Sequence, residues 1–473
     1  MDTSPANRPL FDRFTDWVRR SVLLKLFSVA IVVLLLLIPT GLTLDLVRER
    51  LERRTEAVRE VSSKWGSAQT LGGFVLSVPY QYTVPNGRAE GGRETVRRTL
   101  HLLPDSLALT ATLVSQQRRR GIFRVPLYEV VLELQAQFDS LGARLPVLED
   151  GAELRWADAY FETGVTDIRG ITQASPLTVN GTARRFEPSL PAQEVFASGM
   201  HCPVAVAGGS AYTASFRLVV RGSEALFFLP YGRTTRLTLT GQGRGEAPSF
   251  QGAFLPEAYQ LGDTSFTATW QVLDLNRDLP PSFVGTGVTE SNYRTGADGR
   301  TEYSPEPVYA PKGDAYGFGV RLLAQVNPYS QSERSVKYAV LLIFLTFLTL
   351  FLSEVLARRR VHLVQYLLIG FTLAVFYVVL LALAEHIGFG WAYGLAGAVI
   401  TLYVAGYARA AFGRTRLAAQ LGGLLVLLYG FFYTLLQLED YALLVGSLGL
   451  LVLVGALLYI TRRVDWYRYG QDN

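Results

Sequence analysis

Two adjacent ionisable residues, Glu385 and His386, interrupt a long apolar tract near the C-terminus. A carboxylate beside an imidazole can relay a proton, and ionisable side chains inside a bilayer are costly enough that they usually have a function. The apolar stretches on either side, however, are each long enough to span a bilayer without these two residues. We therefore expect Glu385 and His386 at the exposed turn of a helical hairpin, aided by Gly388 and Gly390, and not in a buried proton relay.

Three more candidate residues, Glu354, Arg360 and His362, lie within or close to a basic run between two apolar segments. Glu354 precedes Arg358 by four residues, a spacing that permits an ion pair on one face of a helix. His362 follows the basic run, where the hydropathy pattern places a membrane interface. We expect ion pairing and interfacial positions for these residues.

The segment ahead of the second apolar stretch is polar and reads SERSVKY over residues 332–338. It joins the large polar region of the chain to the apolar block, so a coupling role is one hypothesis for it. Its candidate residues are Ser332, Glu333, Arg334, Lys337 and Tyr338.

Motifs for catalysis and metal binding are absent from the sequence. It contains no G-x-x-x-x-G-K-[ST] phosphate loop, no H-E-x-x-H, no G-x-S-x-G elbow and no paired C-x-x-C. Cys202, the one cysteine, adjoins His201, but a structural zinc site needs four ligands, so a small buried side chain is the better interpretation. We predict a protein that is not an enzyme and needs neither cofactor nor metal.

The apolar residues collect in six segments of membrane-spanning length. These are residues 22–44, 336–356, 361–384, 387–408, 417–437 and 441–460. Arginines cluster before the first segment and after the second, fourth and sixth, whereas the other short connections carry no Lys or Arg. Because basic short loops stay in the cytoplasm, residues 1–21 and 461–473 are predicted to be cytoplasmic and residues 45–335 periplasmic.

The long polar region is electrically neutral, with 30 basic and 30 acidic residues over positions 46–335, so the net charge of +5 lies near the membrane segments. This distribution argues against a nucleic-acid partner. Residues 46–65 mix charges of both signs with sparse apolar positions and predict a helical stalk. Beyond them, apolar and polar residues alternate with period two between Gly, Pro and Asn/Asp clusters, which predicts a β-rich domain, a sandwich of antiparallel sheets.

Long ordered motifs in this chain resemble the CreD family of bacterial inner-membrane proteins. The resemblance is strongest in YSQSERSVKYAVLLIFLTFLTLFLSEVL and in RRRVHLVQYLLIGFTLAVFYVVLLALAEHIGFGWAY, and continues in KWGSAQTLGGFVLSVPY, LVVRGSEALFFLPYGRTTRLTL and TATWQVLDLNRDLP. It implies a bacterial inner-membrane protein linked to envelope integrity and stress. It implies no reaction and no catalytic residues.

Together these observations predict a non-enzymatic inner-membrane protein whose periplasmic β-rich domain is anchored by, and coupled to, a helical bundle. Its partners would be the lipid bilayer and an envelope protein or lipid that the sequence does not identify. A transporter or channel is the alternative, and a periplasmic enzyme is a weaker one.

Overall fold

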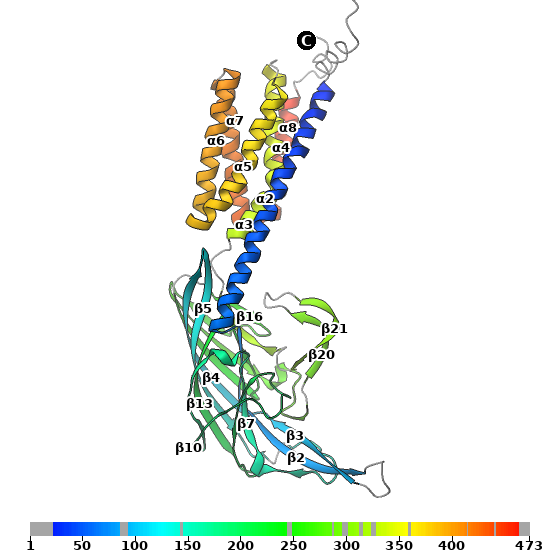
Figure 1. Ribbon diagram of the computed structural model, residues 1–473, viewed down its shortest axis with the longest axis vertical. Helices are drawn as coiled ribbons and strands as arrows, with labels where there is room; N and C mark the ends of the chain where they lie inside the picture. The colour runs from blue at the N-terminus through cyan, green and yellow to red at the C-terminus, as the bar shows by residue number, and fades with distance from the viewer. Residues whose placement is uncertain are drawn as a thin grey trace, which may run out of the picture. The chain divides into compact units, whose positions relative to one another are not determined.

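The computed structural model describes residues 22–85, 93–141, 145–243, 248–285, 288–295, 301–311, 316–322, 328–357, 361–413, 415–438 and 441–462. The chain divides into two compact units (Figure 1). One, here called the helical unit, comprises Met1–Thr55 and Val326–Asn473. The other, the β unit, comprises Glu56–Gln325.

Helix α2 (Val22–Trp65) is a single helix of 44 residues that contains both the first predicted membrane segment and the predicted stalk. Pro39 lies inside it and cannot donate a backbone hydrogen bond. Two threonines close to the proline bond to helix carbonyls, Thr40 Oγ1 to Leu37 O at 2.9 Å and Thr43 Oγ1 to Pro39 O at 2.8 Å. The helix therefore passes through the proline without a break.

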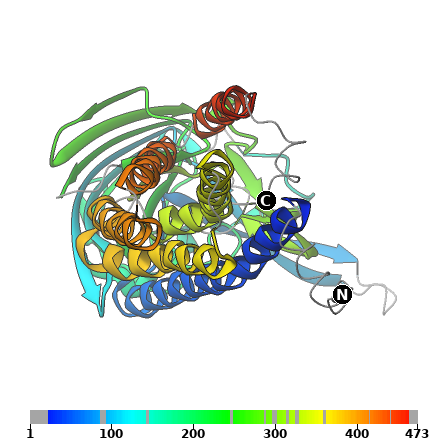
Figure 2. The same cartoon turned by 90° about the horizontal axis from the view of Figure 1, so that it is seen from above.

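The remaining helices of the helical unit lie close together, most of them roughly side by side (Figure 1), and Figure 2 shows them from above. They are α3 (Pro328–Lys337), α4 (Ala339–Ala357), α5 (Leu363–Ile387), α6 (Phe389–Phe412), α7 (Thr415–Gln437) and α8 (Ala442–Thr461). Among the described residues, four helices are long and apolar enough to cross a membrane, or five if the bent pair α3–α4 forms one span. Helix α8 contributes a shorter apolar stretch, Leu443–Ala456, so the sixth span stays a prediction.

The connection between α5 and α6 is tighter than the sequence indicated, because Gly388 alone separates the two helices. Its φ of 82° lies in the region that favours glycine. Glu385 and His386 consequently belong to the last turn of α5 and not to the connecting turn. The expectation that both would be exposed there is half wrong: His386 is exposed, whereas Glu385 is largely covered.

The described residues of the β unit form four sheets, as the alternating pattern of its sequence predicts for a β-rich domain. The nine-stranded sheet contains β4 (Ser106–Arg120), β5 (Phe123–Phe138), β8 (Ile171–Ala174), β9 (Leu177–Val179), β10 (Thr182–Arg184), β13 (Tyr212–Ser223), β15 (Thr234–Gln242), β17 (Ala258–Leu261) and β18 (Ser265–Leu273). The seven-stranded sheet contains β2 (Val75–Pro85), β3 (Arg93–Leu102), β6 (Glu153–Leu154), β7 (Tyr160–Gly164), β11 (Glu187–Pro188), β12 (Gly199–Pro203) and β19 (Ser282–Val284).

Two smaller sheets and several short 3-10 helices are also present in the described part of the β unit. The four-stranded sheet contains β1 (Gln69–Gly72), β14 (Ala225–Leu229), β16 (Pro248–Gly252) and β22 (Phe318–Leu322). The two-stranded sheet contains β20 (Val288–Thr295) and β21 (Thr301–Pro311). The 3-10 helices are η2 (Trp156–Asp158), η3 (Ile168–Gly170) and η4 (Asp274–Asn276).

Strand pairing in these sheets is mostly antiparallel, but two pairs are parallel. Strand β15 runs parallel to β4, and β1 runs parallel to β14. In both pairs the partners are far apart in sequence, and long connections can return the chain in the same direction where a hairpin cannot. The prediction of antiparallel sheets is therefore wrong for these two strand pairs.

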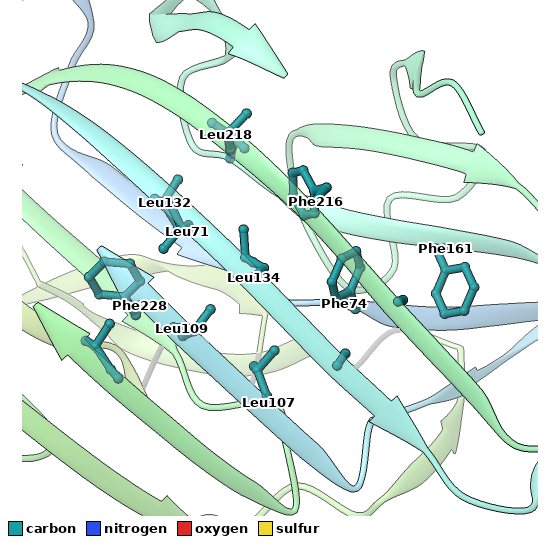
Figure 3. Packing of buried hydrophobic residues seen from close by; sticks show 14 of the residues in the cluster. Leu71, Phe74, Leu107, Leu109, Leu132, Leu134, Phe161, Phe216, Leu218 and Phe228 are labelled. Atoms are coloured by element: carbon teal, nitrogen blue, oxygen red, sulfur yellow. The ribbon is translucent and has the colours of Figure 1, made fainter. Parts of the chain in front are cut away.

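The main core of the β unit lies where the inner faces of the three larger sheets meet (Figure 3). Strand β4 shows the period-two pattern, since Leu107 and Leu109 are buried while Ala108 and Thr110 between them are exposed. Phe74 links the layers, with its ring 6.1 Å from that of Phe161 and 5.1 Å from that of Phe216, measured between centroids. This packing of sheet on sheet is what the sequence predicts.

Candidate functional site

One carboxylate of the helical unit, Glu385, binds side chains from two other helices. Tyr329 of α3 donates a hydrogen bond from Oη to Glu385 Oε1 at 3.2 Å. Arg50 of α2 places Nε 3.7 Å from the same oxygen. The Glu385 side chain is only 11% exposed, so these contacts are partly shielded from water. We call Arg50, Tyr329 and Glu385 the Glu385 cluster.

The sequence predicts the carboxylate but not its partners. Glu385 stands in an otherwise apolar helix, and such a charge requires a partner or water. His386, one residue on, is exposed. The two side chains therefore have different environments, because Glu385 contacts neighbouring helices and His386 is exposed. The structure does not combine them into one acid–base site.

The SERSVKY junction forms most of α3 and the break that follows it. Ser332 is buried, Arg334 is half-buried, and Glu333 pairs with Lys337 at 3.0 Å on the more exposed side. Tyr338 sits between α3 and α4, which meet at an angle of 40°, and its ring stacks on Phe432 with centroids 5.8 Å apart. The junction is therefore a short amphipathic helix packed against its own unit.

A second carboxylate, Glu354 of α4, points into the helical unit. It is 5% exposed, and Tyr366 of α5 donates a hydrogen bond from Oη to Glu354 Oε2 at 3.4 Å. The predicted partner Arg358, like the candidate Arg360, lies outside the described residues. Glu354 is buried, and the predicted ion pair with Arg358 stays a prediction.

His362 has a local structural role as the N-cap of α5. Its Nδ1 accepts a hydrogen bond from the Val364 backbone N–H at 3.3 Å, and Gln365 Oε1 accepts one from the His362 backbone N–H at 3.1 Å. This reciprocal arrangement satisfies two amides at the start of the helix. It accounts for a polar side chain at this position without any chemistry.

Sequence reasoning missed a polar network on the seven-stranded sheet of the β unit. Ser77 on β2 lies opposite His101 on β3, and Ser77 Oγ is 2.8 Å from His101 Nδ1. Ser77 also donates a hydrogen bond to Glu162 Oε1 on β7 at 2.5 Å. His101 Nε2 lies 2.9 Å from Glu194 Oε2 on the other side of the ring. We call these four residues the His101 network.

The electrostatics of the His101 network follow from its burial. Burial by itself lowers the pKa of His101, but the hydrogen bonds to Glu162 and Glu194 outweigh it and hold that pKa above its ordinary value. Ser77, His101 and Glu162 are wholly buried. A partial signal for the network existed in the sequence, because Ser77 and His101 are each flanked on both sides by apolar residues.

Serine, histidine and glutamate are also the residue types of a hydrolase triad. Here the serine hydroxyl is enclosed and already bonds a carboxylate and the imidazole, so no substrate carbonyl can reach it in this arrangement. A cavity of about 300 Å³ in the β unit includes none of these three residues and is lined by others such as Leu113, Asp263 and Phe266. The network has the character of a structural polar cluster.

No group of three or more His, Cys, Asp or Glu side chains in the described part of the chain could hold a metal ion. Cys202 is buried, as expected, and desolvation raises the pKa of its thiol. His201 points its Nδ1 at the Ser189 carbonyl at 2.8 Å and pairs with Glu187 at 3.6 Å. The two neighbours in sequence therefore do not form half of a metal site.

Comparison with known proteins identifies one family. Residues 21–467 match the family described as Inner membrane protein CreD. The chain is 29% identical over 449 residues to the protein named Inner membrane protein CreD of Escherichia coli, and the match covers 94% of each chain.

Two solved structures show distant similarity to this chain. An M1 zinc metallopeptidase from Deinococcus radiodurans is 12% identical, with 43% of this chain and 46% of that chain covered and a TM-score of 0.18. A variant of that enzyme bound to a Tyr-Ser-Ala substrate is 11% identical, with 49% and 52% covered and the same TM-score of 0.18. Scores this low do not indicate a common fold, and nothing about function follows from them.

Proposed function

The chain belongs to the CreD family of inner membrane proteins, and from this premise we propose that it acts, without enzymatic activity, in the integrity of the cell envelope and its response to stress. In this proposal residues 45–335 are periplasmic and both termini are cytoplasmic. The support for this topology is the placement of the arginine clusters in alternate short connections.

The observation that carries the proposal is the Glu385 cluster. Helix α2 is the segment through which the chain leaves the helical unit for the β unit, and α3 is the first helix after the chain returns. Arg50 and Tyr329, one from each of these helices, both contact Glu385 Oε1. A change that displaced either connection would therefore alter the same carboxylate, which is what a protein that couples two units requires.

A deletion strain complemented with variants tests the proposal. The strain should become more sensitive to membrane-active agents, and the wild-type gene should restore resistance. Glu385→Ala should restore it poorly, whereas His386→Ala, the exposed neighbour, should restore it fully at equal protein level in the membrane. Unchanged envelope behaviour of the deletion strain across a broad panel of such agents would contradict the proposed role.

A transporter or channel is the second candidate, and the buried Glu354 favours it. Carboxylates inside membrane helices often line proton or ion paths. In the described residues Glu354 is accompanied by the Tyr366 hydroxyl. Flux of protons or small ions through the purified protein in liposomes, abolished by Glu354→Gln and retained by Glu333→Gln, would replace the first proposal with this one.

A further inference from the structure

One segment of the β unit, residues 189–198, crosses the face of the seven-stranded sheet. It connects β11 to β12, which pair at one edge of the sheet. Yet its Glu194 reaches His101 on β3, three strand positions away from β12 in the order β12-β7-β2-β3. At about 4.8 Å per strand, the segment spans roughly 14 Å of the sheet. We call residues 189–198 the strap.

Apolar contacts hold the middle of the strap. Leu190, Val195 and Phe196 are buried, in one cluster with side chains that include Val75 and Tyr231. The Phe196 ring lies directly over two glycines of the sheets. A Cβ atom at Gly72 would be 2.1 Å from Phe196 Cε1, and one at Gly164 would be 2.3 Å from Phe196 Cδ1. The two glycines thus leave a notch that the ring fills.

Hydrogen-bond donors determine the charge on His101. Ser77 has one hydroxyl proton and donates it to Glu162, so its oxygen accepts from His101 Nδ1–H. On the other side of the ring, the Glu194 carboxylate can only accept, so Nε2 must also carry a proton. With both nitrogens protonated, His101 is an imidazolium.

The two carboxylates beside the ring, Glu162 and Glu194, favour this charge. Glu162 on β7 is wholly buried, and in the described part of the chain its second oxygen, Oε2, has no hydrogen-bond partner. Tyr160, also on β7, lies close enough to Glu162 and Glu194 that their charges raise the pKa of its hydroxyl, after burial as the main cause. Phe283 of β19 covers the ring at 5.2 Å and adds no charge.

We propose that the strap is a pH-controlled latch, fastened while His101 is an imidazolium and released from Glu194 when the ring loses a proton. Ser77 and Glu162 are wholly buried, so no water can replace the Nδ1–H donor there, whereas the Glu194 side chain is 27% exposed. A neutral ring therefore keeps its Nδ1 proton and turns the Nε2 lone pair towards the Glu194 carboxylate, which can only accept. Release exposes the apolar face beneath Phe196 together with the His101 network. The latch stands on contacts within the β unit and goes beyond the proposed envelope function.

Hydrogen–deuterium exchange of the full chain in detergent micelles tests the latch. The exchange is followed by mass spectrometry from pH 6 to pH 10 and corrected for its intrinsic pH dependence. Protection of strap peptides should fall on the order of tenfold or more as the pH rises, since a charge-assisted hydrogen bond is lost. Peptides from β7 and β12 should keep their protection over the same range. This result would show that raised pH opens the strap while β7 and β12 stay folded.

Two variants separate the latch from general unfolding. In Glu194→Gln the pH-dependent step should disappear, because an amide can accept from the charged ring and donate to the neutral one. In Glu187→Gln, a matched change on β11 next to His201, the step should remain. The proposal is overturned by constant strap protection in the wild type, by a step that survives in Glu194→Gln, or by simultaneous loss of protection in β7 and β12.

Discussion

Tyr329 and Glu385, 56 positions apart in the chain, are joined by a hydrogen bond of 3.2 Å that ties α3 to the last turn of α5. The bond joins the Glu-His pair to α3, the helix that also contains most of the SERSVKY junction. It also gives the coupling hypothesis for the junction a specific pair of atoms to test.

Tyr329→Phe should destabilise the helical unit by about 1 to 2 kcal/mol, because a largely buried carboxylate loses a hydroxyl donor. Thermal unfolding in detergent measures this. Glu385→Gln combined with Tyr329→Phe should cost less than the sum of the single changes, since the two side chains form one contact. His386→Ala, the exposed neighbour, should have no effect, and strictly additive effects of the first two changes would rule out the bond.

Gly164→Ala should destabilise the β unit by about 1 to 3 kcal/mol, the usual range for overpacking. The added methyl would collide with the buried Phe196 ring, whose Cδ1 would be 2.3 Å away. Gly262→Ala is the control, since its nearest neighbour would be Ser265 Oγ at 3.3 Å. Adding Phe196→Leu to Gly164→Ala should recover part of the loss in the unfolding temperature.

Asp167 should contribute stability that disappears in acid. The Arg169 side chain, aided by hydrogen bonds from Ser67, holds the pKa of Asp167 at about 2. Because the folded pKa is depressed, the contribution is complete above the ordinary pKa near 4 and is lost as the pH falls towards 2. We expect about 1 to 2 kcal/mol at pH 7 after allowing for the exposed Arg169, from comparison of wild type and Asp167→Asn in chemical unfolding. Equal stability of the two proteins at pH 7 would contradict this.

The contribution of His101 to stability should depend on pH in the opposite direction to that of Asp167. Its pKa is raised in the folded protein by Glu162 and Glu194 against the effect of burial. Its stabilising contribution is therefore complete below the ordinary pKa near 6.5 and is lost as the pH rises through the raised value. The difference in unfolding temperature between wild type and His101→Gln should shrink at alkaline pH; a difference that grows with pH would show that the sign is wrong.

Substitutions of Arg118 and Arg119 should differ in their effects on stability and on Trp65 emission, although the two residues are adjacent. The Arg118 guanidinium lies 4.4 Å from the centroid of the Trp65 ring at the end of α2, and Arg221 covers the same ring at 4.4 Å. Arg118→Ala should cost about 0.5 to 1 kcal/mol of stability and change the emission of Trp65. Arg119→Ala, on the other face of the strand, should do neither.

The candidate sites were only partly predictable. A lone carboxylate in an apolar helix, such as Glu354 or Glu385, is conspicuous in sequence because burial of charge is costly. The direction in which such a side chain points depends on helices encoded elsewhere in the sequence. Both carboxylates point into the helical unit, where each accepts a hydrogen bond from a tyrosine. The His101 network was missed for the same reason, since Ser77, His101, Glu162 and Glu194 come from four separate segments.

The sequence by itself determined the apolar segments, the β-rich texture between them, and the tight turn at Gly388, because each is a local pattern of hydropathy, alternation or backbone freedom. Only the tertiary structure decided the two parallel strand pairs, the convergence of α2 and α3 on Glu385, and the strap that joins Glu194 to His101. These relationships arise from contacts between distant segments. Their energy depends on partners that no local stretch of sequence specifies.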